Sequence, residues 1–319
     1  MGTAMRYRTL GRTGLRVSEV SLGGLFFGKL AKGRDTAATI AAANAAGINF
    51  IDTASAYEGS EKDLGRAFRK TRLREKFVVA TKWWPYDKTG KKILQDPAAM
   101  RRSVEKSLKS LGTDRVEVFQ FHSVTNPGDT AAILSGPLRE ETEKLRKEGK
   151  IRFTGISNSG EWDKDDRRLQ EAARSGWFDT VMPEFLLFRQ RPAKSLFPVC
   201  ARHNVGVITI IPLGQAAWGY GLRDRKYLAD SLKALVKKGK LPDKPAYRRD
   251  DVLDFLLDGK TKTIAAAALR FCLSFREVST VCCGTNDPAH IAENAAVSKA
   301  GPYPPSKLAR AAALFGGIA

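Results

Sequence analysis

Four side chains that can transfer or stabilise a proton lie in the first 122 residues of the chain, and three of them directly follow apolar runs. Asp52 follows Asn-Phe-Ile, Lys82 follows Phe-Val-Val-Ala-Thr, His122 follows Val-Phe-Gln-Phe, and Tyr57 comes five residues after Asp52. A free phenol ionises near pH 10, but a cation within a few ångströms favours the phenolate and helps proton exchange near neutrality. We therefore expect Lys82 to tune Tyr57 and Asp52 to hold Lys82 charged. His122 would donate a hydrogen bond to a carbonyl oxygen lying between it and Tyr57.

Each of these residues also has a structural explanation. A single acid at a strand end is usually a helix cap, a single lysine usually lies on the surface, and one of three histidines can belong to the core. Their convergence on three consecutive strand ends favours the functional interpretation. Such a site would protonate a developing alkoxide, so something else must deliver a hydride.

Apolar, β-branched runs alternate with amphipathic segments along the chain, and this alternation predicts the fold. Eight strands, each followed by a helix, are the count of a (β/α)8 TIM barrel, and nearly continuous apolar strands suit a parallel sheet buried on both faces. Catalytic residues of such barrels lie at the carboxyl ends of the strands, where Asp52, Lys82 and His122 are found. The strands are predicted at 18–24, 49–54, 77–83, 116–122, 152–158, 180–185, 206–212 and 278–284, and the helices at 35–46, 60–70, 97–111, 137–148, 164–175, 263–274 and 287–297.

Two further segments complete the prediction of a single domain over residues 1–319. The leading segment alternates and contains Gly-Arg-Thr-Gly, which predicts a β-hairpin ahead of the first strand. Residues 214–262 are too long for an ordinary connection, so we expect a long loop after strand seven that covers the barrel mouth, with a helix near 226–238.

The composition limits the cellular compartments and the binding partners that we expect for this protein. A formal charge of +20 and a pI near 9.9 raise the possibility of a polyanion partner, but acidic residues are interleaved with the basic ones. Without a nucleic-acid-binding motif we expect a solvated basic surface and no specific nucleic-acid partner. Four cysteines without CxxC spacing fit a reducing cytoplasm and no metal site, and no apolar run is long enough to span a membrane. We expect a monomer or a small homo-oligomer.

Over almost its whole length the chain resembles the aldo-keto reductases. The resemblance rests on RTLGRTGLRVSEVSLGG, FIDTASAYEGSEKDLGRAF, VVATKWW, FQFH, EGKIRFTGISN, VGVITIIPLG and GTNDPAHIAEN, in this order. It implies that Tyr57 is the general acid/base, that Lys82 and Asp52 tune it, and that His122 orients the carbonyl. The implied reaction is NAD(P)H-dependent reduction of an aldehyde or ketone, or the reverse oxidation of an alcohol or sugar.

The same resemblance implies a dinucleotide extended across the barrel, with NADP(H) as the expected cofactor. Relatives that use NADP grip its 2′-phosphate with a lysine and an arginine, where this chain has Gly284 and His290, so NAD(H) is also expected to work. The lean to NADP(H) should grow as the pH falls and the imidazole gains charge. The implied cofactor residues are Ser157 and Asn158 at the carboxamide, Pro212, Leu213 and Gly214 over the pyrophosphate, and Gly284, Thr285, Asn286, His290, Glu293 and Asn294 at the adenosine end, together with Gly24.

Two positions depart from the family's pattern. Met182 stands where relatives commonly carry a glutamine, and Ile210 stands where an aromatic ring often stacks on the nicotinamide. These losses leave open an alternative in which the chain is a cofactor-sensing or regulatory subunit with little turnover. The intact set of four proton-transfer residues favours the enzyme.

Aromatic residues placed just after strand ends predict the substrate pocket. A mostly apolar wall suits aldehydes, ketones and sugar lactols without naming one of them. Core packing is the competing explanation for each ring taken singly. The predicted wall consists of Phe26, Phe27, Trp83, Tyr86 and Trp218, with Trp84 as a further candidate.

Overall fold

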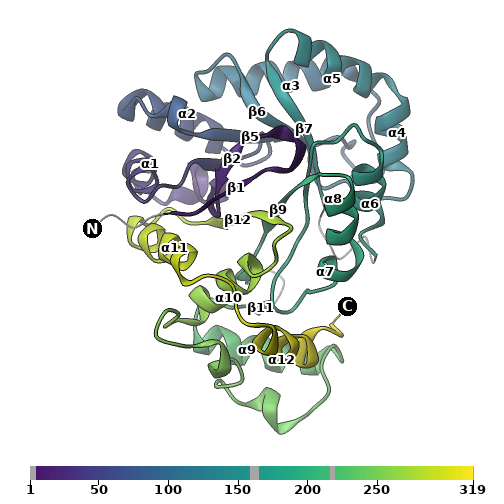
Figure 1. Ribbon diagram of the computed structural model, residues 1–319. Coiled ribbons are helices and arrows are strands. Elements are labelled where there is room, and N and C mark those ends of the chain that lie inside the picture. Colours follow the sequence, from purple (N-terminus) through teal and green to yellow (C-terminus); the bar gives the residue numbers. More distant parts are fainter. Residues whose placement is uncertain (1–4, 159–164, 216–219, 319) are drawn as a thin grey trace.

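Eight parallel strands form a closed barrel in the computed structural model, which describes residues 5–158, 165–215 and 220–318. The strands pair in the order β12-β3-β4-β5-β6-β7-β8-β9, and β12 also pairs with β9 to close the ring (Figure 1). The TIM-barrel fold class predicted from the apolar runs is therefore confirmed. The strands are β3 (Val20–Gly23), β4 (Phe50–Asp52), β5 (Val78–Trp83), β6 (Val116–Phe121), β7 (Ile151–Ser157), β8 (Thr180–Met182), β9 (Gly206–Ile210) and β12 (Val278–Gly284).

Helices surround the barrel, and every helix predicted from the sequence is present (Figure 1). Four others, α4, α7, α8 and α12, were not predicted; α7 has 4 residues and α8 has 6, which is too short for a helical period to show in the sequence. None of the helices that the structure describes is both long and apolar enough to cross a membrane. The helices are α1 (Thr36–Ala45), α2 (Ser60–Thr71), α3 (Pro97–Leu111), α4 (Asp129–Ser135), α5 (Pro137–Lys147), α6 (Arg167–Arg174), α7 (Pro192–Ser195), α8 (Phe197–Arg202), α9 (Arg225–Lys237), α10 (Ile264–Leu273), α11 (Pro288–Ala300) and α12 (Pro305–Phe315).

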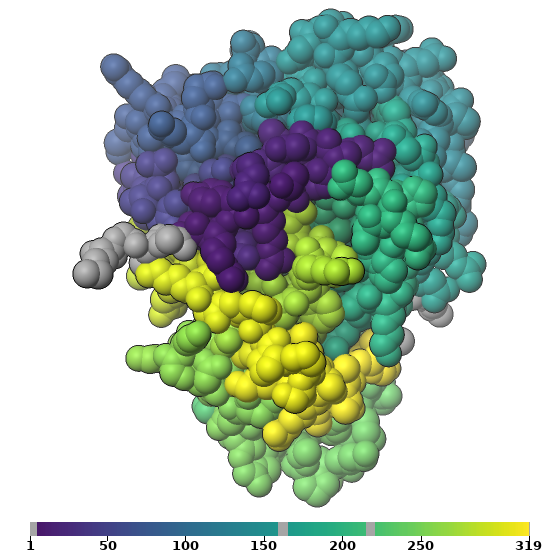
Figure 2. Space-filling view, viewed as in Figure 1, coloured from purple at the N-terminus to yellow at the C-terminus, as the bar shows by residue number. Residues whose placement is uncertain are grey.

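The amino-terminal hairpin covers the end of the barrel at which the strands begin. Strand β1 (Tyr7–Thr9) pairs antiparallel with β2 (Arg16–Ser18), which confirms the predicted hairpin. Leu10 and Val17 are fully buried against side chains of the barrel interior such as Phe50. Figures 1 and 2 show this hairpin in purple, lying across the face of the barrel that is turned to the viewer. The opposite end of the barrel is therefore the one left for a site.

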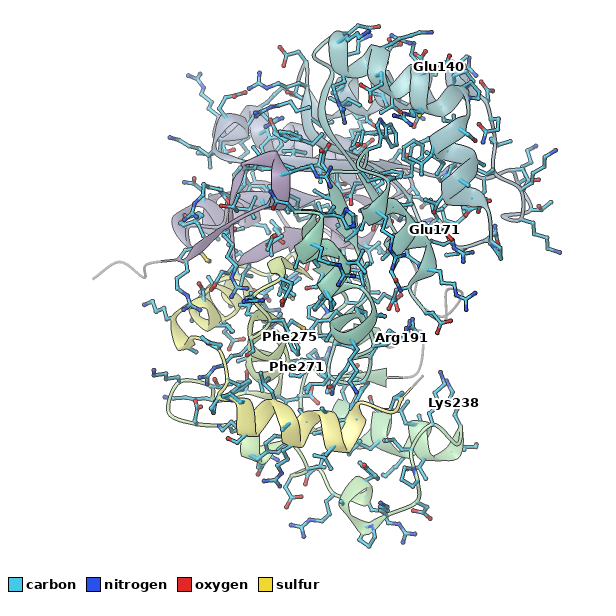
Figure 3. The ribbon with its side chains drawn as sticks, turned by 45° about the vertical axis from the view of Figure 1, so that its right-hand side comes forward. Glu140, Glu171, Arg191, Lys238, Phe271 and Phe275 are labelled. Carbon is cyan, nitrogen blue, oxygen red and sulfur yellow. The ribbon has the colours of Figure 1, made fainter. Side chains whose placement is uncertain are left out.

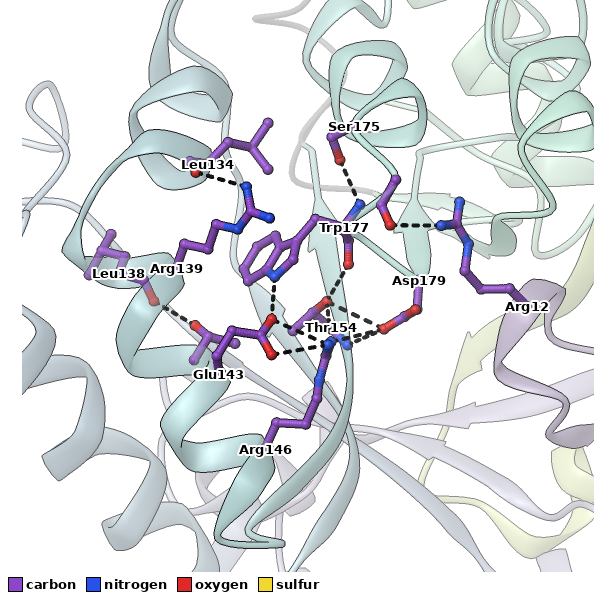
Figure 4. Close-up of polar contacts among 12 residues, drawn as sticks. Arg12, Leu134, Leu138, Arg139, Glu143, Arg146, Thr154, Ser175, Trp177 and Asp179 are labelled. Carbon is purple, nitrogen blue, oxygen red and sulfur yellow. Dashed lines mark hydrogen bonds and ion pairs between the residues drawn. The ribbon is translucent and has the colours of Figure 1, made fainter.

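A network of polar contacts fastens α5 and the hairpin to the outside of the barrel (Figure 4). Arg146 of α5 donates to Thr154 Oγ1 at 3.0 Å and to Asp179 Oδ2 at 3.2 Å. Arg12 of the hairpin donates to the carbonyl oxygen of Gly176, just before β8. These residues are absent from the lining of the cavity described below, so we assign them a structural role.

The long segment after β9 has two parts. A short hairpin of β10 (Gly214–Gln215) and β11 (Tyr220–Gly221) contributes to the barrel mouth, as predicted. The remainder, from α9 to a turn at Asp254–Leu256, forms the lower lobe of the view in Figures 1 and 2 together with α12. Tyr247 in this lobe donates its hydroxyl to the Leu314 carbonyl oxygen of α12 at 2.8 Å. Most of the segment therefore packs beside the barrel and does not cover its mouth.

A cluster of phenylalanine rings holds α10 in place on the barrel. Phe271 of α10 stacks on Phe185 with 5.6 Å between ring centroids, and Phe275 meets Phe185 edge-on at 5.0 Å. Figure 3 labels Phe271 and Phe275 above α12. Aromatic pairs of this kind add stability beyond the area that they bury, so α10 gives β12 a rigid support.

Candidate active site

The carboxyl ends of β4, β5 and β6 bring together the four predicted proton-transfer side chains. Lys82 Nζ donates to Asp52 Oδ2 at 2.5 Å, to the Thr53 carbonyl oxygen at 2.8 Å and to Tyr57 Oη at 3.3 Å. The ammonium nitrogen also lies 4.8 Å from the centre of the Tyr57 ring. All three ammonium protons thus have an acceptor, and one of them points at the phenol.

The loop after β4 returns Tyr57 to the rim of the barrel through a series of turns. Ser55 donates to the Lys82 carbonyl oxygen with both its backbone N–H, at 3.1 Å, and its hydroxyl, at 2.9 Å. The Tyr57 N–H donates to the Ala54 carbonyl oxygen, and the Ser60 N–H at the start of α2 donates back to the Tyr57 carbonyl oxygen. The position of the phenol is therefore fixed by backbone contacts on both sides.

Burial governs the ionisation of the Asp52, Lys82 and Tyr57 group. Loss of solvent raises the pKa of Asp52, while the Lys82 ammonium and the Gln120 amide act against that rise. Loss of solvent also disfavours the charge of Lys82, but attraction to Asp52 outweighs it, so the pKa of Lys82 is raised and the side chain is a cation.

For Tyr57, burial raises the pKa of the phenol more than the nearby Lys82 lowers it. The expected influence of Lys82 is present, but the net shift is upward. The sequence-based picture of a phenol brought toward ionisation is thus corrected. Near neutrality Tyr57 carries its proton, and Lys82 reduces the cost of giving that proton away.

His122 is the first residue after β6, where its backbone N–H donates to the Trp83 carbonyl oxygen at 2.9 Å. Its imidazole stands edge-on to the Tyr57 ring, with 5.7 Å between centroids, and edge-on to the Trp84 ring at 5.8 Å. Burial, aided by the charge of Lys82, lowers the pKa of His122 to about 3. The ring is therefore neutral and has one N–H to donate, as its predicted role requires.

A cavity of about 480 Å³ opens above these side chains, and all four of them line it. This volume lies within the range that is usual for small-molecule sites. Part of the predicted cofactor site lies in the same lining. The residues shared between the prediction and the lining are Gly24, Ser157, Asn158, Pro212, Leu213, Gly214 and Gly284.

The other predicted cofactor residues lie at the end of β12 and on α11, outside the cavity lining. Thr285 Oγ1 is 3.4 Å from His290 Nδ1, so the two side chains lie together at the start of α11. His290 is exposed, and Glu293 is exposed one turn later. Asp287 caps the helix by accepting a hydrogen bond from the Ala289 N–H at 3.0 Å. The start of α11 thus keeps an accessible imidazole, although it has no lysine or arginine of its own.

Two predicted cofactor residues have internal contacts that the sequence did not indicate. The Asn286 amide donates to the carbonyl oxygens of Phe26 at 3.3 Å and Ala31 at 3.1 Å. The Asn294 amide is buried and lies 3.4 Å from Cys283 Sγ. In this structure both amides make contacts within the protein, and their contact with a cofactor stays a prediction.

The predicted aromatic wall is divided between the cavity and the core. Phe26 lines the cavity, whereas Trp218 lies outside the described residues. Phe27 and Trp83 are buried in the main hydrophobic core. Tyr86 is buried as well, and its hydroxyl donates to the Asp129 carboxylate. The structure therefore does not bring Phe27, Trp83 or Tyr86 to the cavity.

Alternation along β5 explains this correction. Because Lys82 points into the barrel, Trp83 points outward, where its ring meets that of Phe121 at 6.2 Å. Trp84 is one residue further on, is 41% exposed and lies beside His122. The same alternation, applied to the sequence, could have separated Trp83 from the site; Trp84 is also absent from the cavity lining and lies beside it, next to His122.

Two residues near the start of α9 line the cavity without having been predicted. The Arg223 guanidinium lies 4.1 Å from the centre of the Tyr227 ring, and its side chain is largely exposed at the rim. The position of Arg223 and Tyr227 depends on how the long segment after β9 folds, which cannot be predicted from the periodicity of the sequence. Arg223, which is paired with Asp224 at 3.4 Å, places its guanidinium beside the cavity.

The two departures from the family's pattern share one wall of the cavity. Met182 ends β8 and Ile210 ends β9, and both line the cavity together with Cys282 of β12. All three side chains pack in the barrel interior. The wall on this side is therefore aliphatic and sulfur-containing, without an aromatic ring among these three residues.

Comparison with known proteins places the chain in a family. The sequence profile of the Aldo/keto reductase family matches residues 19–314. The chain is 29% identical to L-galactose dehydrogenase of Arabidopsis thaliana over 92% of this chain and 88% of that protein. It is 27% identical to the NADH-specific methylglyoxal reductase of Escherichia coli over 81% of each chain.

Solved structures share the fold. An aldo-keto reductase of Klebsiella pneumoniae in complex with NADPH superposes with a TM-score of 0.71 at 24% identity, covering 98% of this chain and 96% of that one. The holo form of an aldo-keto reductase of Bacillus halodurans gives a TM-score of 0.70 over 98% of this chain and 97% of that one. With a family profile that matches almost the whole length, the chain belongs to the aldo/keto reductase family, and the predicted class of NAD(P)-linked oxidoreductase is confirmed.

Proposed function

We propose that this protein reduces aldehydes or ketones to alcohols with NAD(P)H, or catalyses the reverse oxidation, with Tyr57 as the general acid/base. One observation carries the proposal. The Tyr57 hydroxyl is 3.3 Å from the ammonium of Lys82, which is itself buried against Asp52. His122 lines the same cavity. A neutral phenol beside a permanent cation is suited to give up a proton to a developing alkoxide.

The residues divide the work of carbonyl reduction. A carbonyl oxygen between Tyr57 and His122 would accept hydrogen bonds from the phenol and from the neutral imidazole. As negative charge develops on that oxygen, Tyr57 transfers its proton, and the adjacent Lys82 stabilises the phenolate that remains. Asp52 keeps Lys82 charged and aimed throughout.

The cavity fits a nicotinamide dinucleotide by the chemistry of its donors. Ser157 Oγ accepts a hydrogen bond from the Ser123 N–H at 2.9 Å, so its hydroxyl proton can be donated to an uncharged group such as a carboxamide. Asn158 lies next to it in the lining, and Arg223 at the rim suits a diphosphate. When bound, the cofactor supplies the hydride, and these residues bind and orient it.

We propose that both NADPH and NADH are accepted, with a lean to NADPH. The Klebsiella pneumoniae structure contains NADPH, whereas the Escherichia coli relative is named as specific for NADH. The start of α11 itself offers His290 and Thr285 without a lysine or arginine, and the guanidinium of the nearby Arg34 is paired with Asp287 at 2.6 Å, so discrimination by charge is weak there. The net charge of +20 favours the more anionic cofactor in general.

For the substrate we propose a small carbonyl compound or a sugar. Phe26 and Trp84, both partly exposed near the cavity, offer apolar faces that suit an aliphatic chain or the C–H face of a sugar ring. Two relatives are named for sugar-like or small carbonyl chemistry, L-galactose dehydrogenase and methylglyoxal reductase. These names guide the choice of the first compounds to test.

A spectrophotometric screen tests the proposal. Oxidation of NADPH and of NADH is followed with short aldehydes, methylglyoxal and aromatic aldehydes, and reduction of NADP+ and NAD+ is followed with aldoses and simple alcohols. Tyr57→Phe serves as the matched control for contaminating reductases, since it removes one hydroxyl. Turnover that disappears in Tyr57→Phe supports the proposal. Tight cofactor binding without turnover of any compound contradicts it.

Met182 and Ile210 favour a second candidate function, that of a cofactor-sensing subunit. Their side chains form an aliphatic wall where relatives commonly place a glutamine and an aromatic ring. A nicotinamide held less firmly would react slowly while the rest of the dinucleotide still binds. Ile210→Tyr distinguishes the candidates: it should raise turnover several-fold if slow chemistry comes from poor ring positioning, and should leave it at zero if the protein only senses the cofactor.

A further inference from the structure

The second carboxylate oxygen of Asp52 has a buried partner outside the predicted set of four. Gln120 Nε2 donates to Asp52 Oδ1 at 3.0 Å, while Lys82 binds Oδ2. Gln120 lies on β6, two residues before His122, and its side chain is fully buried. Each Asp52 oxygen therefore has its own donor, one charged and one neutral.

The orientation of the Gln120 amide is set by this contact. Gln120 Oε1 is buried and has no hydrogen-bond partner in the part of the chain that the structure describes. Turning the amide over would place Oε1 against the Asp52 carboxylate, where two acceptors repel. Asp52 is thus the one group that explains why a glutamine stands at this buried position.

The neighbouring strand provides space for the Gln120 side chain. A β-carbon added to Gly155 of β7 would lie 3.0 Å from Gln120 Cγ and 2.3 Å from Thr180 Oγ1. Any larger residue at Gly155 would displace the glutamine or the threonine. The barrel interior is therefore shaped so that Gln120 can reach across to Asp52.

The hydrogen bond from Gln120 affects the ionisation of Asp52, because Asp52 lies among other titratable groups. The titratable groups that face Asp52 are the Lys82 ammonium, the Tyr57 phenol and the Cys282 thiol. Burial raises the pKa of Asp52, and the amide donor of Gln120 opposes this rise by stabilising the charged form. Gln120 does so without adding a charge of its own, so it does not compete with Lys82.

We propose that Gln120 is a positioning residue for the proposed reaction: it keeps Asp52 ionised and turned so that its other oxygen faces Lys82. The proposal rests on the proposed function, because it acts on Tyr57 through Asp52 and Lys82. Gln120 itself is absent from the cavity lining, so it is not placed to act on a bound ligand directly. A glutamine kept only for packing would affect stability without affecting the ionisation of Asp52.

Titration of Asp52 tests the proposal without any need for turnover. Carbon-13 NMR of labelled aspartate carboxyl groups in the full-length protein follows Asp52, which is assigned by its loss in Asp52→Asn. A hydrogen bond to a charged group is worth about 1.5–3 kcal/mol, so in Gln120→Leu the titration should move upward by about one to two pH units. Val118→Ala is the control, since Val118 faces the same barrel interior two residues earlier and has no hydrogen-bonding group to offer Asp52. It should leave the titration in place.

A double-mutant cycle tests the link to catalysis. Gln120→Leu should lower kcat about tenfold or more at low pH and move the acid limb of the kcat profile upward, with the cofactor Kd unchanged. In an Asp52→Asn background Gln120→Leu should have no further effect on kcat, because the group through which it acts is gone. If Gln120→Leu does not fold, Gln120→Glu replaces it. The near-isosteric acid must be protonated to donate to Asp52, so activity should fall as the pH rises.

An unchanged titration of Asp52 in Gln120→Leu would overturn the proposal, and so would an equal loss of kcat with and without Asp52. Failure of the proposed function is recognised separately, as a wild-type protein that reduces no carbonyl compound. In that case the NMR titration still decides whether Gln120 controls the ionisation of Asp52.

Discussion

Replacing Asp52 by asparagine should destabilise the fold as well as impair the chemistry. The Asp52 carboxylate and the Lys82 ammonium lie 2.5 Å apart, with side chains only 4% and 2% exposed. Removing one partner of a buried ion pair costs about 3–5 kcal/mol, because the remaining charge is left without compensation. We expect Asp52→Asn to lose free energy of unfolding within this range at neutral pH.

The loss of unfolding free energy in Asp52→Asn should become smaller as the pH rises. Without Asp52 the ammonium loses the attraction that raises its pKa, so burial brings the folded-state pKa of Lys82 below its unfolded value of about 10.4. Between these two values the unfolded state binds more protons than the folded state, and the stability of the variant rises with pH. The deficit is therefore complete below the folded-state pKa and shrinks as the pH approaches 10.4.

Urea unfolding followed by tryptophan fluorescence, from about pH 6.5 to about pH 9.5, measures this deficit. The control is Asp52→Asn/Lys82→Met, which removes both charges. It should regain more than half of the lost free energy without regaining activity, since an apolar replacement of a buried pair is often tolerated. A loss below about 1 kcal/mol in Asp52→Asn, or a double variant no more stable than the single one, would refute the claim that these charges compensate each other inside the barrel.

Three further substitutions address His122, the tryptophan that follows β5, and His290 at the start of α11. His122→Ala should lower kcat by about a hundredfold, because the carbonyl group of the substrate is no longer oriented. Since the pKa of His122 is lowered to about 3, the pH dependence of kcat between about pH 5 and 8 should be unchanged, and a shift in that dependence would contradict the neutral role of the imidazole. Trp84→Ala should raise the KM for an aromatic aldehyde with little loss of stability. The control Trp83→Ala, at a buried position, should lose about 3–5 kcal/mol of unfolding free energy. The reverse pattern in kinetic and thermal-unfolding assays would show that Trp83, and not Trp84, faces the substrate. His290→Arg should tighten NADPH binding about tenfold or more and leave the Kd for NADH unchanged, as measured by quenching of protein fluorescence. Equal effects on both cofactors would show that the 2′-phosphate does not bind at His290.

The strands and the ends of strands could be predicted from the sequence because each corresponds to a local pattern of apolar and polar residues. Apolar runs bounded by polar residues gave β4, β5 and β6 to within a few residues. The period of a strand then placed Asp52, Lys82 and His122 at one end of the barrel. Tyr57 followed because only a short loop separates it from Asp52.

Features that depend on packing between distant segments could not be predicted in the same way. The Asn286 amide donates to the carbonyl oxygens of Phe26 and Ala31, which lie far from it in the sequence, so no local pattern could indicate this contact. The upward pKa shift of Tyr57 depends on how completely water is excluded, which no local pattern reports. Gln120 looked like one more residue of a buried strand until the structure placed its amide against Asp52.

The proposed reaction depends on transfer of the Tyr57 hydroxyl proton, and a single-turnover experiment tests this transfer most directly. Wild-type protein and Tyr57→Phe are each loaded with NADPH and mixed in a stopped flow with a carbonyl compound that the wild type reduces, while the NADPH Kd is measured separately. We predict that the rate of NADPH oxidation falls by at least about a hundredfold in Tyr57→Phe, the size of a general-acid contribution, with the Kd for NADPH within about twofold of the wild type. A rate retained within about threefold would contradict the assignment of Tyr57 as the proton donor.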